Sequence, residues 1–296
     1  MARFVLSAFA DEADVSLAGQ IQALLRNGID HVEMRGVNGR PFVEHSVAEA
    51  KEVQKQLEDH GLSLSAVGSP FGKIGIRDAF APHLDGFKHA LELCHVMHCD
   101  KMRVFSFYMP KEEDPAQFRG EVIDRLHAML EASQDAGVQL AHENEKGIYG
   151  DVTERCLDLM GVFKGKLGGI FDPANFLQCG VRPVEAMACL KEHVTWMHIK
   201  DVRADGIITP AGQGDAHMDQ LLNTLDACYG QTLVLSVEPH LALFKGLASL
   251  ERDELPAFQY KDNHQAFDAA VSGIKQVLTS IGYQEKVEGG KHQWRK

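Results

Sequence analysis

The chain has 296 residues, of which 45% are hydrophobic and 24% are charged, a composition typical of globular proteins with one large α/β domain or two small ones. Its 30 basic and 42 acidic residues give a net charge of −12, which argues against nucleic acid as a partner because such a surface repels a phosphate backbone. No run of residues approaches the ~18 apolar positions that a membrane span needs, so we expect no membrane association.

The first residues and the cysteines indicate a cytoplasmic protein. The opening segment MARFVLSAFADEAD holds one arginine, a short apolar stretch and then acids, which is not the pattern of a secretory signal. The 6 cysteines form no CxxC pair and lack the density of a disulfide-stapled domain, so we expect reduced thiols.

Short apolar runs rich in β-forming residues alternate with longer segments of helical period along the whole chain. The strand-like runs are Phe4–Phe9, His31–Arg35, Leu62–Val67, Lys101–Phe107, Val138–His142, Leu167–Phe171, Thr195–Ile199 and Thr232–Val237. Helices are predicted near residues 15–27, 46–60, 81–98, 114–136, 153–163, 183–191, 217–229 and 264–281. In the third of these, one apolar stripe is formed by Leu84, Phe87, Leu91 and Cys94.

Eight strand–helix units predict an α/β fold, a single-domain (β/α)8 TIM barrel, whose usual length is about 250 residues. We place the barrel at residues 1–283 and expect residues 284–296 to be a loose, polar C-terminal tail. An open doubly wound sheet is the alternative, but it often has a glycine-rich loop after its first strand, and here the first glycine is Gly19. The two long connections, 203–216 and 241–263, are expected on the catalytic face as lids.

Four consecutive predicted strands, the fifth to the eighth, each lead into a residue that can bind a metal ion. In a (β/α)8 barrel, polar residues at the carboxyl ends of the strands face the active site. These residues are Glu143, Asp172, His198 and Glu238, spaced 29, 26 and 40 residues apart, which is about one strand–helix unit each. Because adjacent strands lie about 4.8 Å apart, the four side chains can meet at one point.

Three carboxylates and one imidazole predict a site for one divalent metal ion. Such an oxygen-dominated set suits Mn²⁺, our first candidate, and also Mg²⁺, Co²⁺ or Zn²⁺, with positions left for substrate oxygens. The alternative is four unrelated, surface-facing strand ends that water or a helix N-terminus satisfies, which would require the same coincidence on four successive strands.

Other polar residues near the strand ends are candidates to bind substrate or to support the ligands. Lys200 can bind a substrate oxygen, and Asp201 can orient a ligand; a solvated ion pair between them is the alternative. Arg203 is a candidate substrate clamp, and His240 shares the strand parity of Glu238. The remaining candidates are Glu33, for substrate hydroxyls or for a structural pair with Arg35, and Glu145, as a support for the ligands.

In these residues the chain resembles the xylose isomerase-like TIM-barrel superfamily, the sugar phosphate isomerase/epimerase group. The motifs that carry the resemblance extend from the second strand to the eighth. They are Glu33 in His31-Val32-Glu33-Met34-Arg35, Glu143-Asn144, Phe171-Asp172-Pro173-Ala174-Asn175, His198-Ile199-Lys200-Asp201, Gly212-Gln213-Gly214-Asp215 and Glu238-Pro239-His240. Together they are specific for the superfamily but not for one reaction.

The resemblance implies a metal-dependent enzyme that acts on a sugar, a polyol or a sugar-derived keto compound. In the ketose 3-epimerase branch, residues at the four positions named above hold one divalent metal. The glutamates in the places of Glu143 and Glu238 are the catalytic pair, one removing a proton from carbon and the other returning it, through an enediolate that the metal stabilises.

Two departures from the epimerase pattern affect the substrate rather than the metal. Asn175 replaces a histidine, and Tyr149 replaces an acidic group. Both positions contact substrate in that branch, so Asn175 is expected to bind substrate, but free ketohexoses are not assured as the substrate.

The reaction stays open among several functions. An isomerase or epimerase is the first hypothesis, and a dehydratase of an inosose-like or dehydroshikimate-like compound is the alternative. An endonuclease IV-like phosphodiesterase would need many more histidines and a basic groove, and a non-catalytic sugar-binding barrel would have no reason to keep the whole ligand set. By analogy, a homo-oligomer formed through helices or βα loops is an expectation, with residues 241–263 as a candidate surface.

Overall fold

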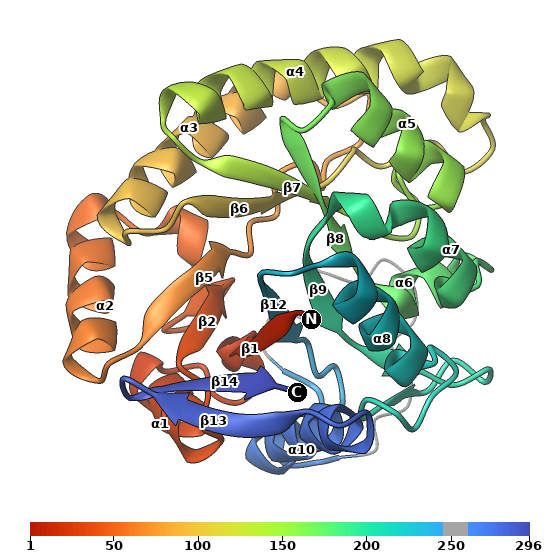
Figure 1. Cartoon of the computed structure of the whole chain (residues 1–296). Helices are drawn as coiled ribbons and strands as arrows, with labels where there is room; N and C mark the ends of the chain where they lie inside the picture. Colours follow the sequence, from red (N-terminus) through yellow and green to blue (C-terminus); the bar gives the residue numbers. More distant parts are fainter. Residues whose placement is uncertain (245–259) are drawn as a thin grey trace.

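Eight parallel strands form a closed barrel in the computed structural model, which describes residues 1–244 and 260–296 (Figure 1). Neighbouring strands pair in chain order, and the first pairs with the last over six residues, from Arg3↔Thr232 to Ala8↔Val237. The barrel strands are β1 (Arg3–Ala8), β2 (His31–Met34), β5 (Ser63–Val67), β6 (Lys101–Val104), β7 (Gln139–Glu143), β8 (Leu167–Phe171), β9 (Val194–Ile199) and β12 (Thr232–Val237). The predicted (β/α)8 TIM barrel is therefore confirmed.

The helices lie around the outside of the strands (Figure 1). They are α1 (Leu17–Arg26), α2 (Val47–Asp59), α3 (Phe80–Val96), α4 (Arg119–Asp135), α5 (Thr153–Phe163), α6 (Pro173–Gln178), α7 (Pro183–Leu190), α8 (Met218–Cys228) and α10 (Asn263–Ser280), with the 3-10 turns η1 (Ala10–Glu12), η2 (Phe42–Glu44), η3 (Pro115–Phe118) and η4 (Lys191–His193). Local signals fix their ends. Ser46 and Glu49 form a capping box at the start of α2, and Gly28, with φ +63°, follows the last residue and the cap of α1.

The inside of the barrel is filled by a small apolar cluster of Ala66, Ala141, Ile170 and Trp196. Three of its members lie two residues before a polar strand-end residue, in the pairs Ala141–Glu143, Ile170–Asp172 and Trp196–His198. Because side chains alternate along a strand, each polar residue points to the same side as its apolar partner. The strand period therefore directs the polar groups into the mouth of the barrel, above this apolar layer.

The C-terminal residues form a hairpin, so the prediction of a loose tail is wrong. Strands β13 (Gln284–Glu288) and β14 (Lys291–Arg295) pair antiparallel, and β14 pairs with β1 at Phe4↔Trp294 (Figure 1). Trp294 is buried, and the backbone N–H of His292 donates to Asp30. The turn is Gly289-Gly290, with φ +58° and +77°, a pair suited to a two-residue hairpin loop.

The two long connections contain little regular structure among the described residues. The segment after β9 holds a short antiparallel ladder of β10 (Asp201–Val202) and β11 (Ile208–Thr209), and a similar ladder of β3 (Gly36–Val37) and β4 (Arg40–Pro41) follows β2. Most of the predicted 241–263 lid, residues 245–259, lies outside the described part of the chain. None of the described helices has the length and apolarity that crossing a bilayer requires.

Candidate metal centre

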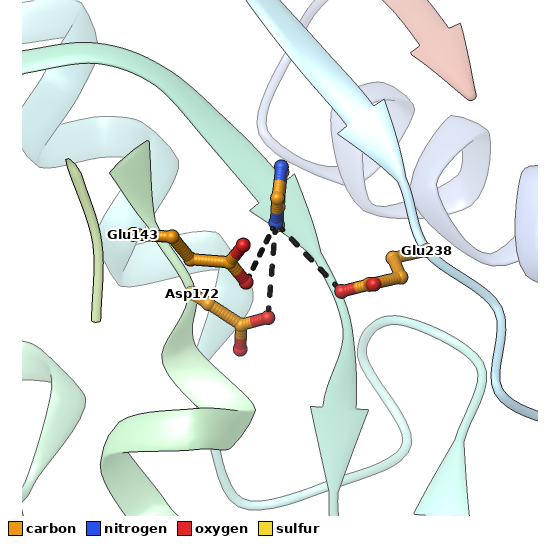
Figure 2. A group of neighbouring side chains, drawn as sticks. Glu143, Asp172 and Glu238 are labelled. Carbon is orange, nitrogen blue, oxygen red and sulfur yellow. Dashed lines mark hydrogen bonds and ion pairs between the residues drawn. The ribbon is translucent and has the colours of Figure 1, made fainter. Parts of the chain in front are cut away.

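Four side chains from consecutive strand ends meet at the mouth of the barrel. Glu143 ends β7, Asp172 follows β8 as the N-cap of α6, His198 lies in β9, and Glu238 follows β12. Each offers one ligand atom, these atoms lie within 4.8 Å of one another, and all four residues are buried. Figure 2 shows the three carboxylates directed toward a single imidazole from different sides.

Glu143 presents one carboxylate oxygen to this centre and keeps the other fixed. Its Oε2 accepts from Nη1 of Arg103 at 2.9 Å. Arg103 is held in turn by the backbone carbonyls of Gly68 and Ser69, to which its Nη2 and Nε donate. The inner oxygen, Oε1, lies 3.1 Å from Nδ1 of His198.

Glu238 has the same division between its two oxygens. Its Oε1 is 3.2 Å from Nη1 of Arg35, and the rest of that guanidinium pairs with Asp11 and Glu12. Its other oxygen, Oε2, faces the centre, 3.7 Å from Nδ1 of His198. The Arg35 guanidinium is thus held mainly by carboxylates that do not belong to the four-residue cluster.

Asp172 completes the pattern through the start of α6. Its Oδ1 accepts the backbone N–H of Asn175 at 2.8 Å, an N-cap bond that fixes the side chain. Its Oδ2 is 4.0 Å from Nδ1 of His198. Each of the three carboxylates therefore has one anchored oxygen and one oxygen that faces the same point, which preorganises the set.

His198 turns one ring nitrogen to the carboxylates and the other to Glu33. Nδ1 faces the centre, while Nε2 lies 3.3 Å from Oε1 of the buried Glu33. Burial lowers the pKa of His198, but the Glu143 and Glu33 carboxylates outweigh it and raise the pKa to about 10. Glu33 therefore supports the imidazole, as carboxylates commonly do behind a metal-binding histidine.

Lys200 lies directly among the inner oxygens. Its Nζ is 2.8 Å from Oδ2 of Asp172 and 3.0 Å from Oε2 of Glu238, and the side chain is almost fully buried. Burial raises the pKa of Asp172 to about 7, with Lys200 opposing the rise. The ammonium therefore supplies a positive charge between these two carboxylates.

The residues present fit a hard divalent cation. With metal–ligand bonds of about 2.1 Å, neighbouring donor atoms of an octahedral site lie roughly 3 Å apart and opposite ones about 4.2 Å apart. The distances from Nδ1 of His198 to the three inner oxygens are 3.1, 3.7 and 4.0 Å, within this range. Within residues 1–244 and 260–296, the other oxygen of Glu33, Oε2, is buried without a hydrogen-bond partner, so the pocket keeps one unsatisfied acceptor behind the imidazole.

Two of the other predicted residues lie beside the cluster. Asn175 donates from Nδ2 to Oε1 of Glu143 at 3.2 Å. His240 places Nε2 3.5 Å from Oε1 of Glu238, and its backbone N–H donates to Glu12. Burial lowers the pKa of the His240 imidazole well below its usual value. Both residues can therefore contribute polar contacts at the edge of the site.

Three predicted residues have other partners. Arg203 has an exposed side chain that pairs with Asp205, so the structure does not place it as a clamp at the cluster. Asp201 accepts the backbone N–H groups of residues 202, 212, 214 and 216, and thus orders its own loop rather than a ligand. Glu145 pairs with Lys73 at 2.7 Å.

Arg103, which the sequence analysis missed, and Arg35, considered only as a structural partner of Glu33, anchor the outer oxygens. The sequence does contain one feature that could have identified Arg103. It is a charged residue between two apolar residues of its strand, Met102 and Val104, which are both buried. A charge at such a position needs a buried partner.

Comparisons with known proteins agree with this architecture. A family model described as a xylose isomerase-like TIM barrel matches residues 21–270. Among solved structures, the IolI protein with a bound zinc atom has a TM-score of 0.73 and 16% sequence identity, over 94% of this chain and 99% of that one. An L-ribulose 3-epimerase has a TM-score of 0.71 and 15% identity, over 95% of this chain and 96% of the other.

Two further matches complete the comparison. The probable 3-DHS dehydratase AsbF from Bacillus anthracis has a TM-score of 0.70 and 14% identity, over 93% of this chain and 99% of that one. A curated alanine racemase from Clostridium perfringens is 27% identical over 116 residues, which is 36% of this chain and 29% of the racemase. The chain therefore spans under a third of that relative.

Proposed function

Because the chain belongs to the xylose isomerase-like TIM barrel family, we propose that it is a divalent-metal-dependent isomerase or epimerase of a sugar or sugar-derived keto compound. One observation carries this proposal. Three buried carboxylates and one imidazole each direct a donor atom at a common point, at the end of the barrel where active sites lie.

We propose that Glu143, Asp172, His198 and Glu238 hold the metal, with Mn²⁺ as the first candidate. A divalent cation bound there would act as a Lewis acid toward a substrate carbonyl, so that the adjacent C–H bond becomes acidic. The bonds from Arg103, Asn175 and Arg35 to the outer oxygens keep the inner oxygens in place for that cation.

Glu143 and Glu238 are proposed as the acid–base pair. They approach from different sides, one from β7 and one from β12 (Figure 2). With the reacting carbon between them, one carboxylate can remove a proton from one face and the other can deliver a proton to the opposite face. Inversion at carbon is the result of such a two-sided transfer.

The polar groups around the pair are proposed to bind the substrate. Asn175, Lys200 and His240 each lie within hydrogen-bonding or ion-pair range of a proposed ligand, so a substrate oxygen bound at the centre would meet them. Glu33 has a different proposed role, since it holds Nε2 of His198 and so directs Nδ1 to the cluster.

Dehydration is the second candidate because it begins with the same proton abstraction. The solved structures that share this fold include both an L-ribulose 3-epimerase and a probable 3-DHS dehydratase. The two reactions differ in whether a hydroxyl group leaves from the carbon next to the carbanion.

A substrate screen in D₂O tests the proposal. The protein, supplemented with Mn²⁺, is incubated with ketoses, inososes and sugar phosphates, and products are analysed by NMR and mass spectrometry. Deuterium at the carbon next to the carbonyl supports the isomerase or epimerase, and loss of water with a new double bond supports the dehydratase. If Mn²⁺ does not bind and no compound of the three classes exchanges, the proposal is rejected.

A further inference from the structure

Lys200 occupies a special position relative to the proposed metal centre. Within the described part of the chain, both of its ion pairs are with oxygens that face the centre, Oδ2 of Asp172 and Oε2 of Glu238. These are the same two oxygens that approach Nδ1 of His198. The ammonium therefore competes for two of the four donor atoms that a metal would need.

The two buried arginines are arranged differently. Among the described residues, Arg103 contacts the cluster through the outer oxygen of Glu143 and is also held by two backbone carbonyls. Arg35 binds the outer oxygen of Glu238 and is held by Asp11 and Glu12. Both guanidinium groups leave the inner oxygens free, whereas Lys200 contacts two of them.

Lys200 also has the means to move. Its flexible four-carbon side chain can redirect the ammonium, whereas the rigid guanidinium of an arginine depends on a fixed set of partners. The backbone of Lys200 directly follows β9, two residues after His198, so its side chain starts from the same strand end as the imidazole.

We infer that Lys200 is a built-in counter-cation that holds the ligand set together without metal and is displaced when the divalent cation binds. This inference rests on the metal site of the proposed function. Without a cation, the inner oxygens of Asp172 and Glu238 would be two buried carboxylate oxygens at close range, which is costly. The ammonium removes that cost and thereby lowers the apparent affinity for metal.

The inference has two measurable consequences. Removing the ammonium eliminates the competitor, so a neutral residue at position 200 is expected to tighten metal binding at least tenfold. The same change leaves the metal-free carboxylates unpaired, so the metal-free variant is expected to melt several degrees lower than the wild type. Added metal should then raise the melting temperature of the variant by more than it raises that of the wild type.

Titration with Co²⁺ tests this at one fixed pH and ionic strength, by calorimetry and by thermal melting. The first variant is Lys200→Met, which removes the charge. The second is Lys200→Gln, whose amide can still donate to the carboxylates. It keeps the test valid if Lys200→Met does not fold. Lys73→Met is the matched control, because it breaks the ion pair with Glu145 outside the cluster. We expect Co²⁺ to bind both Lys200 variants at least tenfold more tightly, and the control within threefold of the wild type.

The outcomes separate this inference from the proposed function. If the wild type binds Co²⁺ and neither Lys200 variant binds it more tightly, the counter-cation role is wrong while the metal site stands. If only the Lys200 variants bind Co²⁺, the ammonium blocks the site and the inference is supported. If no form binds Co²⁺, the metal site of the proposed function and this inference both fail.

Discussion

Arg103 donates to the outer oxygen of Glu143 at 2.9 Å, and both side chains are almost fully buried. The bond joins two neighbouring strands, β6 and β7, at the mouth of the barrel. The two oxygens of the Glu143 carboxylate therefore have different roles. The outer oxygen is anchored to the fold, and the inner oxygen stays available to the centre. Stability and function therefore depend on the same ion pair.

The first prediction is that Arg103→Met destabilises the protein by about 3–5 kcal/mol. The substitution leaves the Glu143 carboxylate buried with one oxygen unpaired, which is the costly half of a broken buried ion pair. Urea unfolding followed by circular dichroism measures the change in the free energy of unfolding.

Arg203→Met is the control for this experiment. Its side chain is exposed and pairs with Asp205, so the change in unfolding free energy should stay within about 0.5 kcal/mol. Equal losses in the two variants would show that the Arg103 bond has no special importance for stability.

The second prediction concerns the proposed acid–base pair. Glu143→Gln and Glu238→Gln should each lower the rate of α-proton exchange by at least 10²-fold, because an amide cannot take up the proton. The far-ultraviolet circular dichroism spectrum should remain that of the wild type. NMR detection of deuterium at the carbon next to the carbonyl gives the rate, with a substrate found in the D₂O screen.

Glu145→Gln serves as the matched carboxylate control. Glu145 pairs with Lys73 and is not one of the four clustered residues, so its variant should keep its exchange rate within tenfold. Wild-type exchange in either Glu143→Gln or Glu238→Gln would reject the two-base mechanism.

The fold could be predicted because the strand and helix periods repeat along the chain. The predicted runs Leu167–Phe171 and Thr232–Val237 coincide with β8 and β12, and each of the other six runs overlaps a barrel strand. The C-terminal hairpin was missed because its strands are polar: β13 is exposed along its whole length, and β14 is half-buried with Trp294 as its one buried residue. The Gly289-Gly290 pair was the available signal.

The proximity of the four clustered residues could also be predicted, because parallel strands bring their carboxyl ends together. The arginine partners could not be assigned from sequence. Arg103 and Glu143 are 40 positions apart, and Arg35 and Glu238 are 203 positions apart. Which cation meets which carboxylate depends on the closed barrel, and the placement of Arg203 outside the cluster depends on its local pair with Asp205.

The third prediction is a loss of stability at acid pH that involves His83. Its Nε2 accepts the backbone N–H of Gly72 at 2.8 Å, and burial, with help from Arg125, lowers its pKa to about 4. The unfolded chain binds the proton near pH 6.5 and the folded chain only near pH 4. Stability therefore falls as the pH falls through this window, by at most about 1.4 kcal/mol per pH unit and by less after solvent screening of this half-buried group.

His83→Gln tests the assignment, since a glutamine oxygen accepts the same N–H without titrating. Urea unfolding at pH 7, 6 and 5 should give a shallower slope of unfolding free energy against pH in the variant. An unchanged slope would mean that other groups, such as the buried His142, account for the acid sensitivity.

The fourth prediction concerns the hairpin. Trp294→Ala should lower the free energy of unfolding by about 3 kcal/mol or more, because it removes the buried indole of β14, the strand that pairs with β1. The control is Val287→Ala in β13, whose side chain is exposed and should cost about 0.5 kcal/mol or less. If Trp294→Ala unfolds like the wild type, the hairpin does not contribute to the stability of the barrel.

The last prediction is that metal stabilises the fold through the clustered residues. A cation that binds only the folded state at 100 times its dissociation constant adds about 2.7 kcal/mol to the free energy of unfolding. The melting temperature measured with Mn²⁺ should therefore be several degrees higher than the one measured with a chelator.

Asp172→Asn tests whether the clustered residues are responsible. The variant keeps an acceptor for the N–H of Asn175 at the start of α6 but removes the charge from the inner oxygen, so its melting temperature should respond much less to Mn²⁺. An equal response in wild type and variant would show that Mn²⁺ binds elsewhere on the protein, since the loss of one of three inward carboxylates must weaken a site that uses all of them.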